Sequence, residues 1–427
     1  MLKKKLRHFI PAAADDWAKQ IERKNEIDKL VQTIAAHSSF YENDDLRIFP
    51  IQQQELWDEG YDAEEQEFTG ARWGKYLRAP KIFFTILEKG KEKLIPLNEI
   101  AGIKRGFTTG ANEFFYLTEK EINTRGIEKE FWMHKDEKGK WIQNYLIKSP
   151  RECEGIVVRP ELLKLRVLMI HKERKKLQGT KMLQYILAGE RKKFHKLDTL
   201  VARQLSYENW KNKKSLKKKP TYFGWYDLGE WMKPDLIWSD AYNTRYAVFD
   251  AANIWADKRF FYVTLNDKEN IPLITAFLNS TLTTLFIDID GITNLGEGAV
   301  YTNVYQLKKL RVPGTKRIGQ KKLSEVLEKL KMRPIDSIFA EVGAHIAQEV
   351  SLSKVKSDRR ELDKIIMGDI LGLTEEEQLE VYRTVIDLVK SRIEKAQSVD
   401  KINKIVEGMD LTLLAKHSVK RIKHKRK

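Results

Sequence analysis

The sequence has almost no cysteine and no long apolar run, and each shortage excludes a class of protein. Only Cys153 is a cysteine among 427 residues, so neither an intrachain disulfide nor a cysteine-based zinc site can form. No apolar segment approaches the roughly 18 to 20 residues that span a bilayer. The basic start of the chain precedes an apolar stretch too short for a signal peptide. We therefore expect a cytoplasmic protein with no membrane partner, in which Cys153 is a small buried or surface side chain rather than a nucleophile.

Catalytic and cofactor motifs are also missing. The eight histidines are scattered, and no His-Glu-x-x-His pattern occurs. Gly314 and Gly319 have the spacing of a phosphate-binding loop, but Gln320 stands where that loop needs lysine. Asp288 and Asp290 precede a glycine without the spaced oxygen ligands of a calcium loop. Methyl transfer to a base amino group needs a polar-Pro-Pro-aromatic loop, and no two of the 11 prolines are adjacent. The residues therefore predict no catalytic group, no metal and no cofactor in this chain.

Positive charge is what the chain has in excess. Its 78 lysines and arginines against 61 acidic residues give a formal net charge of +17. Residues 159–219 hold 19 cations and 5 carboxylates, so one seventh of the chain carries a net +14. Aromatic residues such as Tyr207, Trp210 and Trp225 lie within or just after this segment, and cations interleaved with rings suit phosphate contact and base stacking. The pattern favours a nucleic-acid partner over the alternative, a merely solubilising surface.

One stretch, residues 103–117, combines two cations with a glycine turn. It reads IKRGFTTGANEFFYL, with Gly106 and Gly110 four residues apart. Two such glycines allow a tight turn that another molecule can approach closely. β-Branched and aromatic residues on both sides predict a strand, a polar turn and a second strand. An ordinary hairpin without a binding role is the alternative.

The remaining pattern predicts an α+β fold: a twisted, mostly antiparallel β-rich domain with inserted helices, followed by a helical C-terminal region. We predict helices over residues 12–37 and 81–89, and one helix from Pro272 to Asp290. A short strand at 46–51 precedes the main set. Those strands fall at residues 99–104, 114–117, 142–147, 156–158, 163–170, 220–227, 236–238, 246–249 and 260–265. The chain then divides into a helical connector (1–96), the β-rich domain (97–313) and a helical region with a basic tail (314–427).

Two features organise the C-terminal helices. Leu323, Val326, Leu327 and Leu330 form one apolar stripe. Thr374 with Glu377 makes a capping box that opens a later helix. An apolar seam with steps of three and four residues follows in that helix; its members are Leu379, Tyr382, Ile386, Val389 and Ile393. The seam fits packing within the chain, or docking on another protein.

Six segments in a fixed order resemble a known family. They read RWGKYLRAP, EIAGIKRGFTTGANEFF, WMKPDLIWSD, LITAFLNSTLTTLF, GEGAVYTNVYQLKKLRVP and RRELDKIIMGDILGL. This order resembles the C-terminal half of adenine-specific DNA methyltransferases from bacterial restriction–modification systems, notably the target-recognition domain. In that family a catalytic domain with an Asn/Asp-Pro-Pro-Tyr loop precedes this region and binds S-adenosylmethionine. We expect that cofactor on a partner or missing domain and assign methyl transfer to no residue here.

The resemblance implies a specificity module that reads double-stranded DNA, with a methyltransferase or restriction partner held through the C-terminal helices. Two alternatives stay open. The chain is part of an adenine-specific DNA methyltransferase, or of a combined restriction–methylation enzyme, that is active once completed by its N-terminal half, or it is a helical scaffold with incidental charge. A recognition module needs cations for phosphates and polar side chains for base edges. The candidates in the opening stretch are Lys104, Arg105, Thr108, Thr109 and Asn112. Candidates in the basic segment are Lys172, Arg174, Lys175, Lys176, Arg191, Lys192, Lys193, Arg203, Tyr207, Trp210, Lys213, Lys214, Lys217 and Lys218, and further along come Asn243, Arg245 and Asn303.

Overall fold

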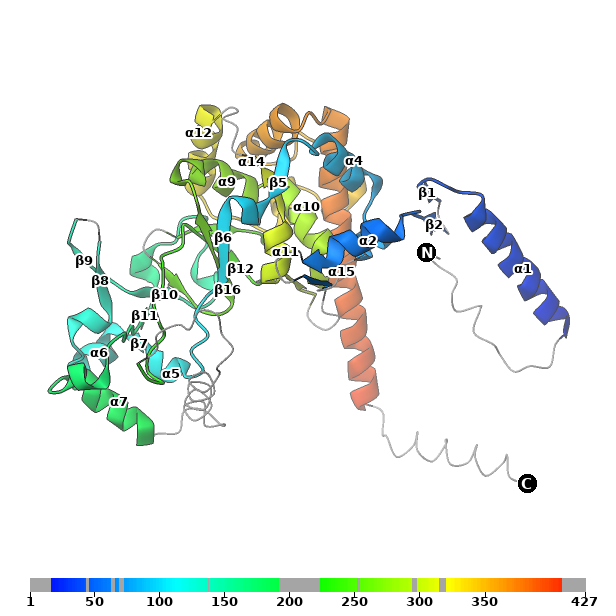
Figure 1. The fold of residues 1–427 in the computed structure, drawn as a ribbon. Helices are drawn as coiled ribbons and strands as arrows, with labels where there is room; N and C mark the ends of the chain where they lie inside the picture. Colours follow the sequence, from blue (N-terminus) through cyan, green and yellow to red (C-terminus); the bar gives the residue numbers. More distant parts are fainter. Residues whose placement is uncertain are drawn as a thin grey trace, which may run out of the picture. The chain divides into compact units, whose positions relative to one another are not determined.

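The computed structural model describes residues 17–43, 46–62, 66–68, 73–136, 138–191, 223–251, 254–293, 298–314 and 320–408. The chain forms two compact units, Met1–Thr85 and Ile86–Lys427 (Figure 1). The division at residues 96 and 313 that the sequence suggests stays a prediction.

The first unit is small and mostly helical. Its elements are α1 (Trp17–Ala35), β1 (Tyr41–Glu42), β2 (Arg47–Ile48), α2 (Gln53–Gly60), β3 (Tyr61–Asp62), β4 (Glu67–Phe68) and α3 (Gly74–Arg78), and α4 (Lys81–Lys89) begins here. The predicted helices at 12–37 and 81–89 are confirmed within the described residues. The buried Arg47 guanidinium donates to the Ala79 carbonyl oxygen at 2.8 Å and to Glu42 at 2.7 Å. These bonds link the β1–β2 pair to the residue that follows α3.

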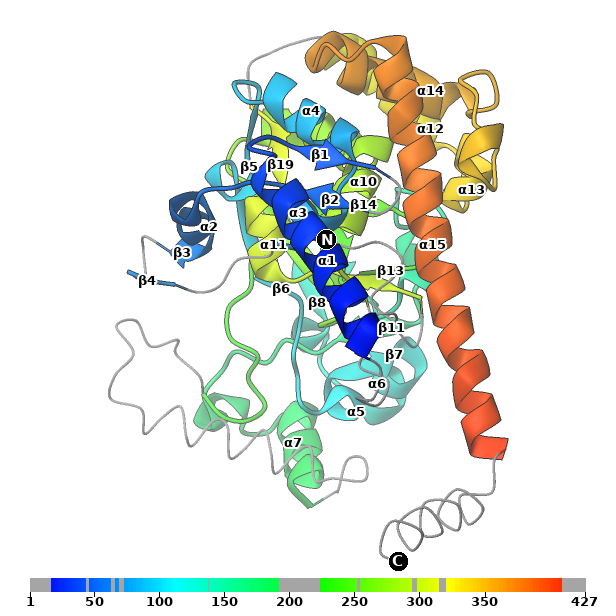
Figure 2. The same ribbon diagram turned by 90° about the vertical axis from the view of Figure 1, so that its right-hand side faces the viewer.

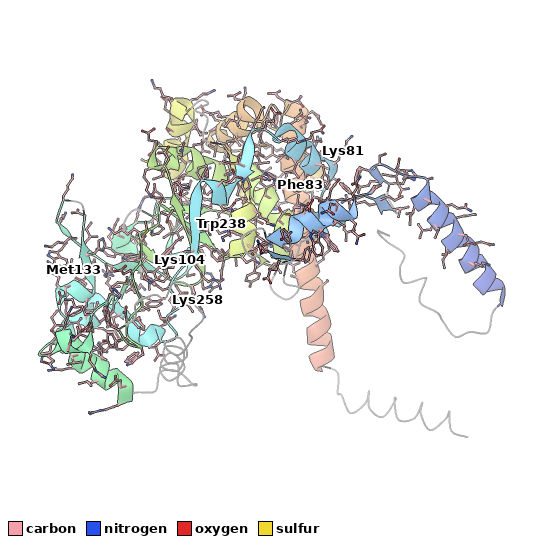
Figure 3. The ribbon with its side chains drawn as sticks, viewed as in Figure 1. Lys81, Phe83, Lys104, Met133, Trp238 and Lys258 are labelled. Carbon is pink, nitrogen blue, oxygen red and sulfur yellow. The ribbon has the colours of Figure 1, made fainter. Side chains whose placement is uncertain are left out.

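The second unit contains a four-stranded antiparallel sheet at its centre. The strand order is β14 (Val248–Asp250), β12 (Leu236–Ser239), β16 (Phe260–Leu265) and β6 (Ala101–Arg105). All four residues of β12 are buried, and Trp238 is among the largest fully buried side chains (Figure 3). The strands predicted at 236–238 and 260–265 are confirmed. One row across this sheet runs Val248, Trp238, Phe261, Arg105.

A second four-stranded sheet follows the order β15 (Trp255–Ala256), β10 (Tyr145–Ile147), β11 (Leu165–Val167) and β7 (Tyr116–Thr118). Only β10 and β15 run parallel in the pairs of this sheet. Smaller antiparallel groups are β8 (Met133–Lys135) with β9 (Trp141–Gln143), β5 (Leu94–Pro96) with β19 (Arg311–Pro313), and β13 (Ala241–Tyr242), β18 (Val300–Tyr301) and β17 (Ile292–Thr293). Helices α6 (Glu119–Arg125) and α7 (Lys181–Arg191) are inserted between strands. The predicted α+β class is confirmed.

Several predicted strands were wrong in detail. Phe114 and Phe115 belong to a short helix, α5 (Asn112–Phe115), because their N–H groups bond back to the Ala111 carbonyl. The run at 142–147 is two strands separated at Asn144, whose side chain bonds His134 and the Val167 carbonyl oxygen. Residues 156–158 form only an isolated bridge through Val157. The described part of the run at 220–227 is a turn.

The helix predicted from Pro272 to Asp290 is two helices, α9 (Ile271–Leu278) and α10 (Thr281–Asp290), bent by 72°. The break falls at Asn279, whose side-chain amide bonds both the N–H and the carbonyl oxygen of Val248 at 2.9 Å. Ser280 then caps α10 by accepting from the Thr283 N–H. In the described part of the chain no single helix is long and apolar enough to cross a bilayer. The bent pair reaches that length and apolarity only when its two helices are taken together.

The C-terminal part of the chain is mostly helical (Figure 2). Its elements are α11 (Val304–Lys309), α12 (Gln320–Lys331), α13 (Ile338–Val342), α14 (Ser357–Asp363), a π-helical turn (Lys364–Ile370) and α15 (Glu375–Gly408). The α12 stripe is buried and α12 packs on α9. The Thr374 capping box is confirmed. Tyr382, Ile386 and Val389 of the seam are buried within the chain, where α15 packs on α10. These three residues therefore serve internal packing, not docking on another protein.

A buried carboxylate holds these helices together. Glu341 in α13 accepts from Arg333 at 2.7 and 2.8 Å and from Arg359 at 2.6 Å, and it is 1% exposed. Burial alone would raise the pKa of Glu341, but the hydrogen bonds from Arg333 and the charge of Arg359 lower it far below 4.5. Arg359 also donates to the Asn279 carbonyl oxygen at 3.0 Å. The cluster thus joins α13 and α14 to the break between α9 and α10.

Replacing Glu341 by Gln should lower the free energy of unfolding by about 3 kcal/mol at neutral pH, because the buried Arg359 guanidinium loses its counter-charge and the half-buried Arg333 keeps only Asp358 as a partner. A carboxyl with a depressed folded pKa stabilises the fold above its unfolded pKa, and that contribution is lost as the pH falls toward the folded pKa. Urea unfolding should therefore show the gap between wild type and E341Q narrowing below about pH 4.5. E328Q is the control, since Glu328 is exposed and pairs only at the surface with Lys331. Equal effects of the two changes would contradict this role.

Candidate nucleic-acid interface

Four cations gather at one end of the central sheet. Lys104 and Arg105 end strand β6, and Lys258 and Arg259 immediately precede its antiparallel neighbour β16. The four residues are exposed, and Figure 3 labels Lys104 and Lys258 in this region. We refer to these four residues as the sheet-end cluster. Antiparallel pairing brings the two dipeptides together although they are 153 residues apart in sequence.

Aromatic rings line the cluster. The Lys104 ammonium nitrogen lies 3.5 Å from the centroid of the Trp231 ring, and the Arg105 guanidinium lies 5.1 Å from that of Phe261. Partial burial lowers the pKa of Lys104. One carboxylate is close: Asp240 lies 3.5 Å from Arg105, and burial raises its pKa against the opposing charges of Arg259 and Arg105. In the described part of the chain, Asp240 is the one carboxylate in an ion pair with the cluster. The cluster therefore keeps a positive excess.

The glycine turn after β6 is pinned to the protein at several points. The Gly106 N–H donates to the Phe260 carbonyl oxygen at 2.9 Å. A Cβ on Gly106 would lie 2.6 Å from the Ala256 carbonyl oxygen and closer still to that of Asp257. The buried Asp257 carboxylate accepts from the Tyr116 hydroxyl at 3.0 Å and from the Asn112 amide at 3.3 Å. Gly106 is thus required by close backbone contact rather than by turn conformation.

The polar residues of this turn are only partly available. Thr109 is buried, donates to the Asn112 side chain and accepts from the Ala111 N–H at 3.1 Å. Asn112 bonds Asp257, as described above. Thr108 is exposed. The structure therefore uses Thr109 and Asn112 to hold the turn, and Thr108 is the predicted contact residue that faces solvent.

A second basic group lies around a 3₁₀ turn (Arg174–Leu177) and α7; its members are Lys172, Arg174, Lys175 and Lys176. Three of them already have carboxylate partners: Lys172 with Glu130 at 2.8 Å, Arg174 with Glu190 at 2.6 Å and Lys175 with Glu173 at 2.7 Å. Lys176 and Arg191 are exposed. A phosphate here would compete with those carboxylates, so the group is weaker than its cation count suggests.

An aromatic cluster fixes α7 against the turn. The Phe114 ring of α5 stacks on Tyr185 of α7 with centroids 4.6 Å apart and lies 4.8 Å from Trp225. Gly189 lets these rings close in, because a Cβ there would be 3.1 Å from Phe114 and 3.2 Å from Trp225. The Trp225 indole donates to Glu190 at 3.1 Å. Phe114 and Trp225, the latter from the aromatic-rich segment, are buried core residues, and Tyr185 is half-buried against them.

Three further candidates hold the fold through intramolecular bonds. Arg245 donates to the carbonyl oxygens of Cys153 at 2.7 Å and of Pro150. Asn303 forms the capping box of α11 with Gln306. Asn243 is exposed, and its carbonyl oxygen accepts from Arg392 at 2.7 Å. DNA contact by these three side chains stays a prediction.

The other candidates lie outside the described residues; they are Lys192, Lys193, Arg203, Tyr207, Trp210, Lys213, Lys214, Lys217 and Lys218. The described residues 159–191 hold nine cations and three carboxylates, a net +6 of the +14 in the whole basic segment. Most of that charge therefore belongs to residues 192–219.

Sequence reasoning missed Lys258 and Arg259. Their signal was position: they directly precede the correctly predicted strand at 260–265, and that strand is an antiparallel neighbour of the one carrying Lys104 and Arg105. Assigning the neighbour needed the sheet order, which a single sequence does not supply.

No group of three or more histidine, cysteine or carboxylate side chains is arranged for a metal in the described part of the chain. Cys153 is buried, and burial raises the pKa of its thiol to about 11. A thiol that stays protonated at neutral pH is a poor nucleophile. Of the two placements predicted for it, buried or at the surface, Cys153 takes the buried one.

Comparison with known proteins places the chain in a family. Residues 71–347 match the model of the C-terminal domain of the type II methyltransferase M.Eco57I, more than half of the chain. The chain belongs to this family. The match contains the sheet-end cluster, the glycine turn and the second basic group.

Two further comparisons add nothing to this family assignment. The crystal structure of the type IIG restriction endonuclease BpuSI is similar with a TM-score of 0.46 and 14% identity, over 78% of this chain and 35% of that one. The chain thus spans about a third of the length of that enzyme. No curated protein sequence matches significantly.

Replacing Gly106 by Ala should destabilise the protein by about 2 kcal/mol, because the new methyl group overlaps two backbone oxygens that cannot move aside cheaply. Gly102 on the same strand is the matched control: its nearest neighbour to a new Cβ is a carbonyl oxygen 3.9 Å away. G102A should change the free energy of unfolding by less than about 0.5 kcal/mol in urea titrations. Similar losses for the two variants would show that the close approach at Gly106 does not limit stability.

Proposed function

We propose that this chain reads a duplex DNA target for an adenine-specific methyltransferase of a restriction–modification system. The observation that carries the proposal is the sheet-end cluster, an exposed group of cations backed by aromatic rings, inside the region matched by the methyltransferase family. Cations that neutralise phosphates fix a protein's register on the duplex, and nearby polar groups can then read base edges. The pinned turn begins at the residue after Arg105, and its exposed Thr108 supports the proposal as a polar group close in sequence to these cations.

Methyl transfer itself is assigned to a domain that binds S-adenosylmethionine and holds the extruded adenine in an Asn/Asp-Pro-Pro-Tyr loop. That loop is not among the residues of this chain. We propose that the domain acts together with this chain in the cytoplasm, either as a separate polypeptide or joined to it. The recognition surface would then decide which adenine the catalytic domain reaches.

Binding to duplex DNA should weaken steeply between about 50 and 200 mM salt. Each phosphate contact that is lost should flatten the slope of log affinity against log salt by about 0.9. We therefore expect the variant K104Q/R105Q/K258Q/R259Q to bind more weakly and with a flatter slope than wild type in fluorescence anisotropy. The control K91Q/K321Q/K322Q/K364Q removes four exposed lysines elsewhere in the same unit and lowers the net charge equally.

Two results would contradict this assignment. If wild-type affinity does not change with salt, the protein does not bind DNA through phosphates. If both variants flatten the slope equally, net charge acts without a localised interface and the sheet-end cluster loses its role.

Sequence recognition is a separate expectation. Selection from a duplex library with a randomised centre should enrich one consensus with the wild-type protein, because base-edge contacts discriminate by about 1–3 kcal/mol per base pair. T108V should blur the consensus while keeping the salt slope, since Thr108 is exposed and carries no charge. Sequencing of the bound pool measures both. A flat pool for wild type would leave DNA binding but remove target recognition.

A further inference from the structure

One exposed apolar side chain stands beside the sheet-end cluster. Met232 is 77% exposed, and it directly follows Trp231, the residue whose ring lies against the Lys104 ammonium group. Single exposed apolar residues are common on protein surfaces and usually need no explanation. Met232 differs from such residues because the loop that carries it, and the neighbouring Trp231 ring, are held in place by several contacts.

The loop that carries Met232 is fixed on its N-terminal side by the buried carboxylate of Asp227. Asp227 accepts from the N–H groups of Phe223 at 2.9 Å and Gly229 at 2.7 Å, and it lies 2.9 Å from the His171 ring nitrogen. Gly229 has a φ of 80°, a left-handed conformation that turns the chain toward Trp231. The nearby exposed Glu230 has its carboxylate 3.6 Å from His171.

The other side of the loop is fixed by the central sheet. Pro234 is buried, and Asp235 accepts from the Leu265 N–H at 2.7 Å and pairs with Lys268 at 2.6 Å. The backbone N–H of Asp235 donates to Val263 at 3.0 Å. Met232 therefore projects from a short segment held at both ends.

The residue next to Met232 is itself anchored. The Trp231 indole donates to the Leu228 carbonyl oxygen at 2.7 Å, and its ring lies 4.4 Å from Phe107 and 5.7 Å from Tyr262, centroid to centroid. Phe107 is fully buried and is the second residue of the pinned glycine turn. Three features therefore occur together: the anchored Trp231 ring, the exposed Met232 side chain next to it, and the Lys104 ammonium group against the Trp231 ring.

We propose that Met232 is a wedge that inserts between base pairs of duplex DNA while the sheet-end cluster holds the flanking phosphates. Proteins that distort a duplex use an apolar side chain of this kind, Met included, to separate neighbouring base pairs. The unbranched thioether adapts to an irregular gap better than a β-branched residue does. Unstacking a step next to the target adenine also eases its extrusion, which methyl transfer requires. The inference rests on the proposed DNA-binding function and adds a residue to it.

A wedge binds better where the stack is already weakened. The probe is a pair of duplexes of about 30 base pairs and identical sequence, one fully paired and one with a single central mismatch. Wild type should prefer the mismatched duplex by about tenfold, because part of the unstacking cost has been removed. M232A should bind both duplexes nearly equally, and M232L should keep the preference because Leu is also an apolar wedge. Anisotropy titrations measure the ratio, and 2-aminopurine beside the mismatch reports unstacking directly.

Met332, which directly follows α12 and is 84% exposed, provides the matched control. M332A should keep the mismatch preference, and urea unfolding should show both Met→Ala variants as stable as wild type. If wild type binds DNA with a steep salt slope but without mismatch preference, the wedge is disproved and the DNA-binding function stands. If M332A loses the preference as M232A does, Met232 has no special role. If wild type does not bind DNA, both proposals fall.

Discussion

The buried carboxylate of Glu341 is the contact on which the arrangement of the second unit depends. Two arginines share it, and a charge so deeply buried is tolerated only when it is paired. From there Arg359 bonds the Asn279 carbonyl oxygen, and the Asn279 side chain bonds both backbone groups of Val248. A continuous polar path therefore runs from the C-terminal helices to the central sheet. Val248 lies in the same row of that sheet as Arg105, so the path meets the sheet in the row that ends at this one residue of the cluster.

A parallel set of contacts fixes α15. Arg392 pairs with Asp288 of α10 at 2.9 Å and donates to the Tyr246 hydroxyl at 2.7 Å. The fully buried Asp363 accepts from the first N–H of α10, at Thr281, and from Tyr382 of α15. These side chains leave the helix pair α9–α10 little freedom to shift against α14 and α15. The helical region that follows the matched family segment is thus part of the support for the sheet rather than a loose appendage.

Sequence patterns predicted what local physics decides. The apolar runs of β12 and β16, the stripe of α12 and the Thr374 capping box are properties of neighbouring residues, and they were found. The breaks at Asn144 and Asn279 were not, because each is set by an amide bonding a backbone group far away in sequence, Val167 or Val248. The sheet-end cluster shows the same difference between local signals and contacts far apart in sequence. Lys104 and Arg105 were recognised beside their glycines, whereas Lys258 and Arg259 needed the strand order.

Counting cations overstated one basic region and understated another. The group around Lys172 and Arg174 looked strong in sequence, yet the fold brings Glu130 and Glu190 onto it from other elements. A phosphate arriving there must displace a carboxylate that is already hydrogen-bonded, so much of its Coulomb gain is offset. At the sheet-end cluster the ion-paired carboxylate of the described structure is Asp240, 3.5 Å from Arg105, and the raised pKa of that group reflects how little water it retains. A cluster of four with one such neighbour is the stronger phosphate site, although it has no more cations.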